Sequence, residues 1–310
     1  RGVEPASSSG PPRGPRGDGV GAISSCWGCE GGGGRAPGAK WDVPGVYITL
    51  QPGTKRDVRM QERVRNLRPT AEIKRFLGSD GGGDERCFSL EDLEDEVDAR
   101  TVCTCISHWS AIAAALAAFP HAPYVVVLED DASFELLPLW PGTLRAFLDT
   151  LSSQVPAWEM LNLAVSNRHA LPKWRERTYF EEYKWRGAVW PPRPVHKGAV
   201  AYAVRRTTAV EETVRRMEVC TASVESVGAP ECVRLLQWHA DLSVYFAFTA
   251  VAATMPLVVI NNTADVSSRT GQASDTAADT HMRLRDVFVR LWEHEALHDA
   301  WRASLARWRG

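Results

Sequence analysis

The segment YVVVLEDDASF, residues 124–134, places three acidic side chains directly after five apolar residues. The apolar run predicts a buried β-strand over residues 124–128. Its carboxyl end then carries Glu129, Asp130 and Asp131. Adjacent carboxylates repel one another and resist leaving water, so they are expected to face a cation or a polar ligand. The segment therefore predicts a binding site, and the alternative is an acidic turn or helix cap after the strand.

The spacing of these acids suggests what they bind. In open α/β sheets, ligands gather at the carboxyl ends of the strands. Side chains two residues apart in an extended segment point the same way, so Glu129 and Asp131 can share a divalent cation, or divide between a cation and a ribose. His239 completes this predicted metal site if its loop returns to the strand ends.

The elements that must position these acids follow from apolar periodicity. Further strands are predicted over 46–50, 158–165, 198–206 and 257–260. Helices are predicted over 56–67, 103–119, 208–219, 243–254 and 284–308. A capping-box spacing from Thr208 to Glu211 marks one helix start. Strands alternate with helices, which predicts an α/β fold with a mostly parallel, Rossmann-like sheet flanked by helices.

Composition sets the broad class. The sequence is 44% hydrophobic and 24% charged, which is ordinary for a globular enzyme. A formal charge of -2 and a pI near 6.5 give no overall electrostatic case for nucleic acid or an acidic membrane surface. The uncharged run 243–260 approaches the length of a membrane span, but Pro256 interrupts it. We therefore expect a core segment there, no membrane span and no nucleic-acid partner.

The chain is predicted to have one folded domain with two flanking regions. Residues 1–40 are rich in Gly, Pro and Ser and lack apolar periodicity, which predicts a disordered leader. A single domain is expected over 41–268, followed by a C-terminal helical extension over 269–310. In the extension, apolar residues recur near a 3.6-residue period.

The cysteines leave the compartment open. Of seven cysteines, only Cys26 and Cys29 have CxxC spacing, and no second CxxC completes a zinc site. Asn261-Asn262-Thr263 is one glycosylation acceptor that a lumenal protein could use. The chain begins at Arg1, so any targeting segment can be absent from it. Both the lumen of the secretory pathway, in the ER or Golgi, and the cytoplasm fit these observations.

The succession of these segments resembles glycosyltransferase family 25, which contains lipooligosaccharide galactosyltransferases and collagen hydroxylysine galactosyltransferases. The resemblance covers roughly residues 45–265. Its most specific part is the helix containing CTCISH, followed closely by the strand that ends in Glu-Asp-Asp. The lead into Ser-His and the acidic stretch over 80–98 depart from the family pattern.

The resemblance implies a GT-A type fold and a metal-dependent, inverting transfer of a hexose. The donor would be a UDP-sugar, UDP-galactose or UDP-glucose, the cofactor manganese or another divalent cation, and the acceptor a glycan or a hydroxylated protein side chain. Galactose is the sugar it favours. A non-catalytic carbohydrate- or protein-binding module is one rival, and a metal-dependent phosphohydrolase is another. The latter needs a second set of metal ligands, and the sequence shows no HxH or DxH cluster.

Site residues carry over position by position. The acids at 129–131 match the family's metal and nucleotide-sugar motif, Ser107 and His108 its serine-histidine pair, and Gly198 and Tyr202 its glycine-to-tyrosine strand. These matches imply donor binding by Glu129, Asp130, Ser107, His108 and Gly198. A lone histidine in an apolar helix is more often a satisfied core residue than a ligand, and this alternative stays open for His108.

Glycosyl transfer also needs a base for the acceptor hydroxyl. Asp241 matches the family's acid after the helix region, and a carboxylate within hydrogen-bond reach of the hydroxyl can take this role. The alternative for Asp241 is an N-cap of a helix beginning at Leu242. Residues 168–197 combine aromatic and basic side chains, which predicts an acceptor loop or lid, or else a connector.

Overall fold

The computed structural model describes part of the chain. The described residues are 40–67, 69–79, 99–140, 142–154, 156–164, 199–227, 229–232, 240–248, 250–252, 257–260, 285, 286 and 289. The chain divides into two units, Arg1–Gly34 and Arg35–Gly310, and every described residue belongs to the second. Except for Lys40, the predicted leader lies outside the described residues, as does most of the predicted C-terminal extension.

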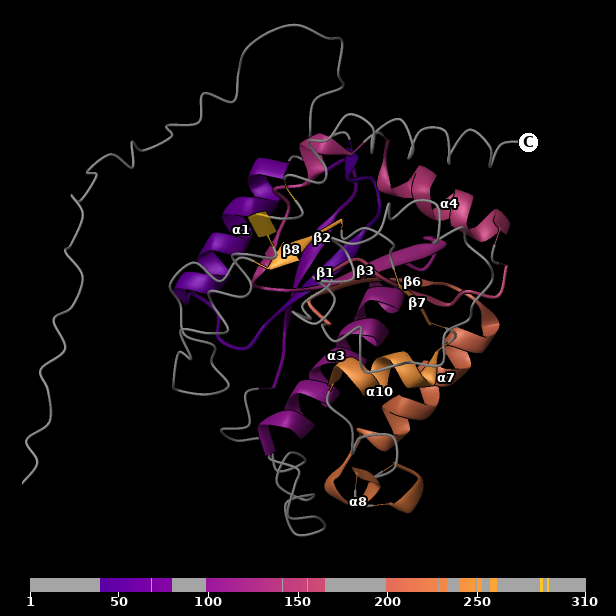
Figure 1. The fold of residues 1–310 in the computed structure, drawn as a ribbon. Coiled ribbons are helices and arrows are strands. Elements are labelled where there is room, and N and C mark those ends of the chain that lie inside the picture. Colours follow the sequence, from indigo (N-terminus) through magenta and orange to yellow (C-terminus); the bar gives the residue numbers. More distant parts are fainter. Residues whose placement is uncertain are drawn as a thin grey trace, which may run out of the picture. The chain divides into compact units, whose positions relative to one another are not determined.

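A six-stranded sheet forms the centre of the described structure (Figure 1). In spatial order its strands are β2 (Ile73–Leu77), β1 (Gly45–Thr49), β3 (Tyr124–Glu129), β6 (Ala201–Arg205), β5 (Met160–Asn162) and β7 (Ala250–Ala252). β6 runs antiparallel to both of its neighbours, and the other pairs are parallel. The predicted α/β class with a mostly parallel sheet is confirmed.

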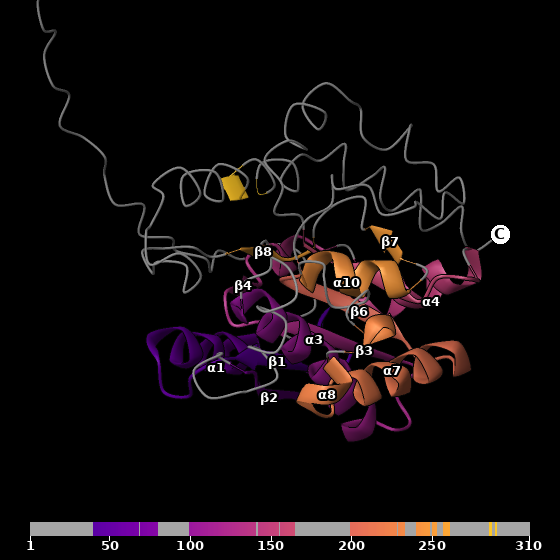
Figure 2. The ribbon, with the colours of Figure 1, turned by 90° about the horizontal axis from the view of Figure 1, so that it is seen from below.

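Helices cover both faces of this sheet. The helices are α1 (Lys55–Leu67), α3 (Ala99–Ala118), α4 (Leu144–Gln154), α7 (Thr208–Cys220), the short α8 (Val224–Val227) and α10 (Ala240–Ala247). α1 and α4 share a buried apolar cluster with one face of the sheet. α3, α7 and α10 share a second cluster with the other face. Figure 2 shows α3 beside α7 and α10 on that face.

Alternation along the strands creates the two clusters. In β3, Val126 and Leu128 pack towards α1 and α4, while Val125 and Val127 pack towards α3. All four side chains are fully buried, as expected for a central strand covered on both faces. The strand therefore has no freedom to slip, and its last residue, Glu129, is held at a defined place on the sheet edge.

The long helix α3 belongs to the core. Its segment Thr101–Ala118 is long and apolar enough to cross a membrane, and it is the one such segment within the described ranges. Yet Ile106, Ile112 and Ala115 are buried against the sheet and neighbouring helices. Alanines make this close packing possible because they add little bulk between helix and sheet. We therefore assign α3 to the protein interior.

Close approach of two strands fixes the identity of one glycine. A Cβ atom built on Gly45 would lie 2.2 Å from the carbonyl oxygen of Val126. That oxygen belongs to the neighbouring strand β3, and a backbone atom cannot swing aside as a flexible side chain does. β1 can therefore pack this closely on β3 only with glycine at position 45.

Two sequence predictions on this face need correction. The helix predicted over 243–254 instead occupies Ala240–Ala247, and Ala250–Ala252 forms the edge strand β7. An uncharged run is buried in either form, so its composition did not separate the two. The cap of α7 is Thr207, whose side chain accepts from the Val210 amide, rather than the capping box from Thr208.

A small second sheet and a helical turn complete the acid-bearing end. β4 (Ala132–Ser133) follows the acids and pairs antiparallel with β8 (Val259–Ile260). The 3-10 turn η2 (Leu137–Leu139) comes next along the chain. Beyond it, Arg285 forms an ion pair with Glu135, which ties a described fragment of the predicted C-terminal helix to the segment after the acids. The segment that follows the acids is thus held by distant parts of the sequence.

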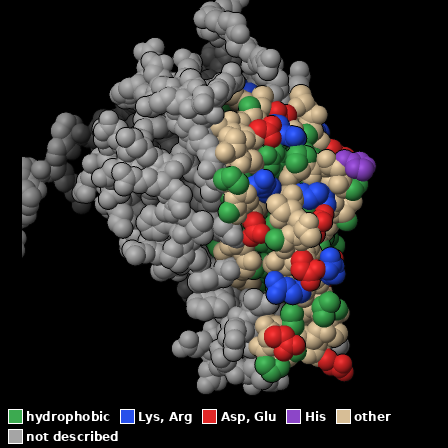
Figure 3. Space-filling view, turned by 90° about the vertical axis from the view of Figure 1, so that its right-hand side faces the viewer, with side chains coloured by type: hydrophobic (Ala, Val, Ile, Leu, Met, Phe, Trp, Pro, Cys, Tyr) green, Lys and Arg blue, Asp and Glu red, His purple; other side chains and the backbone are tan. Residues whose placement is uncertain are grey.

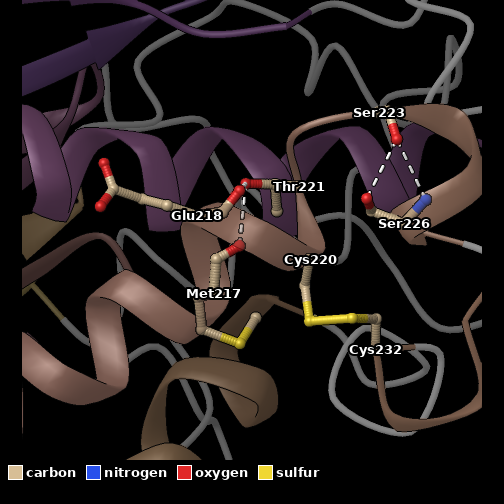
Figure 4. The surroundings of a disulfide bond; sticks show 7 residues. All are labelled: Met217, Glu218, Cys220, Thr221, Ser223, Ser226 and Cys232. Carbon is tan, nitrogen blue, oxygen red and sulfur yellow. Dashed lines mark hydrogen bonds between the residues drawn. A yellow bond between two sulfur atoms is a disulfide. The ribbon is translucent and has the colours of Figure 1, made fainter.

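A disulfide joins the end of α7 to the segment after α8 (Figure 4). It links Cys220 and Cys232, which are 12 residues apart. Beside it, the Thr221 hydroxyl donates to the Met217 carbonyl at 3.0 Å. Cys103 is disulfide-bonded as well. Disulfides persist mainly in oxidising compartments, so these bonds favour folding in the secretory pathway over the cytoplasm.

The described part of one surface is mixed in charge. Figure 3 shows basic and acidic side chains interspersed with apolar ones on this face. Among the pairs that the structure forms are Arg206 with Glu211 and Arg145 with Asp149. Exposed pairs of this kind contribute little to stability. No large basic patch covers the described part of this face.

Candidate functional site

The acids lie where the sequence predicts them, at the carboxyl end of β3. Glu129 is the last residue of the strand, and Asp130 and Asp131 form a turn before β4. Because the chain turns there, the extended alternation that would pair residues 129 and 131 does not continue. The shared partner is instead common to Asp130 and Asp131: the Arg56 Nη2 atom lies 2.6 Å from Asp130 Oδ1 and 3.2 Å from Asp131 Oδ2.

Arg56 comes from the first turn of α1, directly after the loop that follows β1. Because β1 and β3 are parallel neighbours, that loop and the acids meet at the same edge of the sheet. The Arg56 side chain is about one quarter exposed, and its buried Nε atom has no hydrogen-bond partner within the described structure. Among the described residues, Arg56 is the cation that contacts these acids most closely.

A buried carboxylate next to Arg56 fixes the loop. Asp57 is fully buried and accepts from Tyr47 Oη at 2.9 Å, the Gly53 amide at 2.8 Å and Gln61 Nε2 at 2.9 Å. Gly53 has a φ of 78°, a conformation that favours glycine. Asp57 thus ties the turn to both β1 and α1, and Arg56 is held in place with them.

The site holds more negative than positive charge. The pKa of Asp131 is raised to about 7, first by burial and then by the Glu129 charge, against the opposing effect of Arg56. Burial also raises the pKa of Asp130 against the effect of Arg56. For Arg56, burial lowers the pKa, but the attraction of Asp131 and Asp130 outweighs it and the pKa ends above its usual value. The arginine therefore does not fully neutralise the acids.

Arg63, about two turns further along the same face of α1, adds a second and weaker positive charge near the acids. Its Nη1 atom donates to the Ala132 carbonyl at 2.8 Å. Burial lowers the pKa of Arg63, and the Asp131 and Glu135 charges oppose that effect. Arg63 therefore serves the backbone of β4 first and the acids only through space.

One oxygen at the site fits an additional cation. Asp131 Oδ1 is buried and has no hydrogen-bond partner within the described structure. An orphaned carboxylate oxygen is costly to bury, and hard divalent cations prefer oxygen donors of this kind. Within the described ranges, no three His, Cys, Asp or Glu side chains are grouped as metal ligands. The predicted ligand His239 lies outside those ranges, so the metal site stays a prediction.

The third acid is connected to the core. Glu129 Oε1 lies 3.3 Å from His108 Nε2, and His108 Nδ1 lies 3.0 Å from the Tyr202 hydroxyl. His108 is 1% exposed and Tyr202 is fully buried. His108 is therefore a core residue with two polar partners, one of which is a predicted ligand-binding acid. The structure thus places His108 in the core, and donor binding by His108 stays a prediction.

Ser107, the other member of the predicted Ser-His pair, makes bonds within the fold. Its buried hydroxyl donates to the Cys103 carbonyl at 2.8 Å and accepts from the Ser79 amide at 2.8 Å. It thus connects α3 to the residues after β2. Donor binding by Ser107 stays a prediction.

The remaining predicted residues are not brought together by the described structure. Gly198, His239 and the segment 168–197 lie outside the described residues. Asp241 lies in the first turn of α10, which begins at Ala240. The N-cap alternative for Asp241 is therefore wrong, because the helix has already begun there. The description of Asp241 extends to its backbone only.

Arg56 and Asp57 organise the site, although no sequence pattern predicts a role for either residue. A charged pair at the start of an amphipathic helix resembles an ordinary solvated first turn. The order of elements is one signal that could have indicated Arg56. In a parallel sheet, the residues just after one strand lie near the carboxyl end of the adjacent strand. The sequence alone does not show that β1 and β3 are neighbours.

We expect Asp57→Asn to lower the free energy of unfolding by about 3 kcal/mol at neutral pH, as for other broken buried charge networks. Burial raises the pKa of Asp57, but its three hydrogen bonds and the Arg75 charge outweigh this and leave the pKa lowered. Its stabilisation is thus present above the unfolded-state pKa and lost as the pH falls through the folded-state value.

Denaturant unfolding at pH 7 and pH 3 measures this effect. The difference between wild type and Asp57→Asn should shrink at the lower pH. Glu62→Gln, an exposed change on the same helix, is the matched control and should have little effect. Equal stability of Asp57→Asn and wild type at pH 7 would contradict the anchoring role.

We expect Asp131→Asn to stabilise the protein above pH 7. The folded-state pKa of about 7 exceeds the ordinary 3.8, so Asp131 favours folding fully only below the lower value. That contribution is lost as the pH rises through the folded-state pKa. Thermal unfolding should give a higher Tm for the variant at pH 8 and a smaller difference at pH 5.

Asp149→Asn, which alters an exposed carboxylate on α4, serves as the control for this comparison. A Tm for Asp131→Asn below that of wild type at pH 8 would mean that the Asp131 charge stabilises the fold. In that case its contact with Arg56 outweighs its burial.

Comparisons with known proteins add little to this geometry. No family model matches the sequence, and no curated protein matches it either. Among solved structures, the apo form of mouse xyloside xylosyltransferase 1 is similar over 67% of this chain and 80% of that chain, with 10% sequence identity and a TM-score of 0.29. A likeness at this level carries no argument, so function has to be argued from the site.

Proposed function

We propose that this chain is a metal-dependent glycosyltransferase of GT-A type that transfers a hexose from a UDP-sugar to a glycan or hydroxylated protein acceptor. The observation that carries the proposal is the under-neutralised acid cluster at the carboxyl end of β3, with a buried Asp131 oxygen that lacks a partner. This is the place where an α/β sheet binds its ligand.

Each acid has a role in this proposal. Asp131 and Glu129 would hold the divalent cation with His239, and Asp130 would bind the nucleotide sugar. A bound divalent cation supplies Lewis-acid neutralisation of the diphosphate leaving group. Arg56 carries a planar guanidinium suited to a phosphate, and it lies within the same cluster. Asp241 would accept the proton of the acceptor hydroxyl.

The proposed sugar, cation and stereochemistry rest on the family resemblance alone. Galactose as the sugar, manganese as the cation and inversion at the anomeric carbon follow from the similarity to glycosyltransferase family 25. The disulfides support the lumen of the secretory pathway as the compartment. There the acceptor would be a glycan or a secreted protein.

A non-catalytic binding module is the second candidate, and one contact favours it. Arg56 already pairs with Asp130 and Asp131, as would be expected if the acids served only the fold. The buried Asp131 Oδ1 atom opposes this alternative, because a purely structural pairing is expected to give such an oxygen a partner, and none is present within the described structure. Ligand binding decides between the two.

The proposal is tested by thermal stabilisation with a panel of nucleotide sugars, each with and without Mn²⁺. We expect a UDP-hexose with Mn²⁺ to raise the Tm of the wild type, and Asp131→Asn to lose this rise because a carboxylate ligand is gone. Asp149→Asn should respond as the wild type does. If no nucleotide sugar stabilises the wild type with or without the metal, the proposal fails.

Asp241→Asn tests the assignment of the base. With the donor identified by the panel, we expect turnover to fall by a factor of roughly a hundred to ten thousand, the usual range for a general base. Donor affinity should change much less, since the base acts on the acceptor. Steady-state kinetics and donor titration separate the two quantities. An equal loss of donor binding would instead make Asp241 a ligand of the metal or nucleotide.

A further inference from the structure

We propose that His108 and Tyr202 are positioning residues that hold the Glu129 carboxylate in one orientation at the donor site. The inference rests on the proposed function, because it assigns Glu129 to the cation and the donor. Its basis is a chain of polar contacts that runs from the core to the sheet edge: Tyr202 Oη to His108 Nδ1 at 3.0 Å, and His108 Nε2 to Glu129 Oε1 at 3.3 Å.

The three residues come from three elements that the fold locks together. Glu129 ends β3, Tyr202 lies on the adjacent antiparallel strand β6, and His108 lies on α3, which packs across both strands. The Glu129 amide donates to the Val200 carbonyl at 2.8 Å, and Tyr202 lies opposite Val127 in the strand register. The distances between the three side chains are therefore set by the sheet and not by loops.

Exposure changes along the chain of contacts. Tyr202 is fully buried, His108 is 1% exposed, and the Glu129 side chain is 28% exposed. The polar groups thus begin in the apolar core and end at a carboxylate that solvent can reach. A buried polar chain of this kind is costly unless every member is bonded, and once bonded it is rigid. Rigidity at Glu129 is what a ligand-binding carboxylate needs.

The contacts select one form of the neutral histidine. A neutral imidazole has one N–H donor and one acceptor nitrogen. The carboxylate of Glu129 only accepts, so Nε2 must carry the proton that faces it. Nδ1 then accepts from Tyr202, whose burial raises the pKa of its hydroxyl well above the ordinary value and keeps the proton in place. Tyr202 therefore acts on Glu129 through the tautomer of His108.

Tyr202→Phe tests this with little change of shape, since it removes only the hydroxyl. In the wild type, ¹⁵N NMR of labelled histidine should show His108 as the Nε2–H tautomer. In the variant we expect a mixture of tautomers, and a dissociation constant for UDP with Mn²⁺ that is higher by about tenfold, as for one lost hydrogen bond. Calorimetry at a single pH measures that constant.

Three further variants separate positioning from general stability. Tyr124→Phe removes a hydroxyl bonded to Ser152 Oγ at 2.7 Å on the opposite face of the sheet. It should leave both readouts unchanged. His108→Gln retains an N–H group that can face Glu129, and it should preserve more binding than His108→Leu.

Each outcome decides something. An unchanged tautomer in Tyr202→Phe, or unchanged binding despite a changed tautomer, overturns the positioning role. Equal losses in Tyr202→Phe and Tyr124→Phe also overturn it, because they indicate general destabilisation. If the wild type does not bind UDP with Mn²⁺, the proposed function and the donor role of Glu129 fail together, and the tautomer still shows whether the hydrogen-bonded chain exists.

Discussion

The excess of negative charge at the end of β3 is the constraint on which the site depends. A strand buried on both faces delivers Glu129, Asp130 and Asp131 to one edge of the sheet, where burial removes much of the water that would solvate them. Arg56 offsets part of this cost by contacting two of the three. The desolvation cost that Arg56 does not offset is seen in the raised pKa of Asp131. A bound cation would remove this cost, and the free energy so released would favour binding.

Arg56 can neutralise the acids in part only if its backbone position is fixed. The neighbouring residue Asp57 fixes that position. Asp57 is buried with a full set of donors from β1, the following turn and α1. Such a network has few ways to rearrange, because each donor would lose its acceptor. The first turn of α1 is therefore stiff, although it follows a loop. A long arginine side chain can then reach the acids from a fixed backbone position, at a smaller entropic cost than from a mobile loop.

Prediction from sequence succeeded where a pattern is local. The apolar run before the acids and the alanine-rich helix over 99–118 have periodicities that tertiary contacts do not override, and both elements form as expected. β2 was missed because it is an edge strand with a half-exposed, charged sequence, IKRFL. The run after position 243 was assigned wholly to helix because an uncharged segment is buried in a helix or a strand alike.

The candidate site was predictable only in its acids. The partners of those acids lie far away in sequence: Tyr202 is 94 residues from His108, and the described elements β2, α3 and β3 lie between Arg56 and Asp130. Nothing in a single sequence indicates which strands are neighbours, and the antiparallel insertion of β6 beside β3 is what brings the tyrosine to the histidine.

The acids are contacted from two sides, by Arg56 of α1 and by His108 of α3. On the α1 side, Arg56 draws Asp130 and Asp131 together through charge. On the α3 side, His108 Nε2 lies 3.3 Å from Glu129 Oε1, and the Tyr202 hydroxyl in the core contacts the other nitrogen of the same ring. Since Glu129 also repels Asp131, a fixed Glu129 keeps that repulsion at full strength instead of letting the two side chains move apart. The fold thus preserves the repulsion between Glu129 and Asp131, which lowers the stability of the folded state. Proteins keep unfavourable arrangements of this kind at sites that serve binding rather than stability.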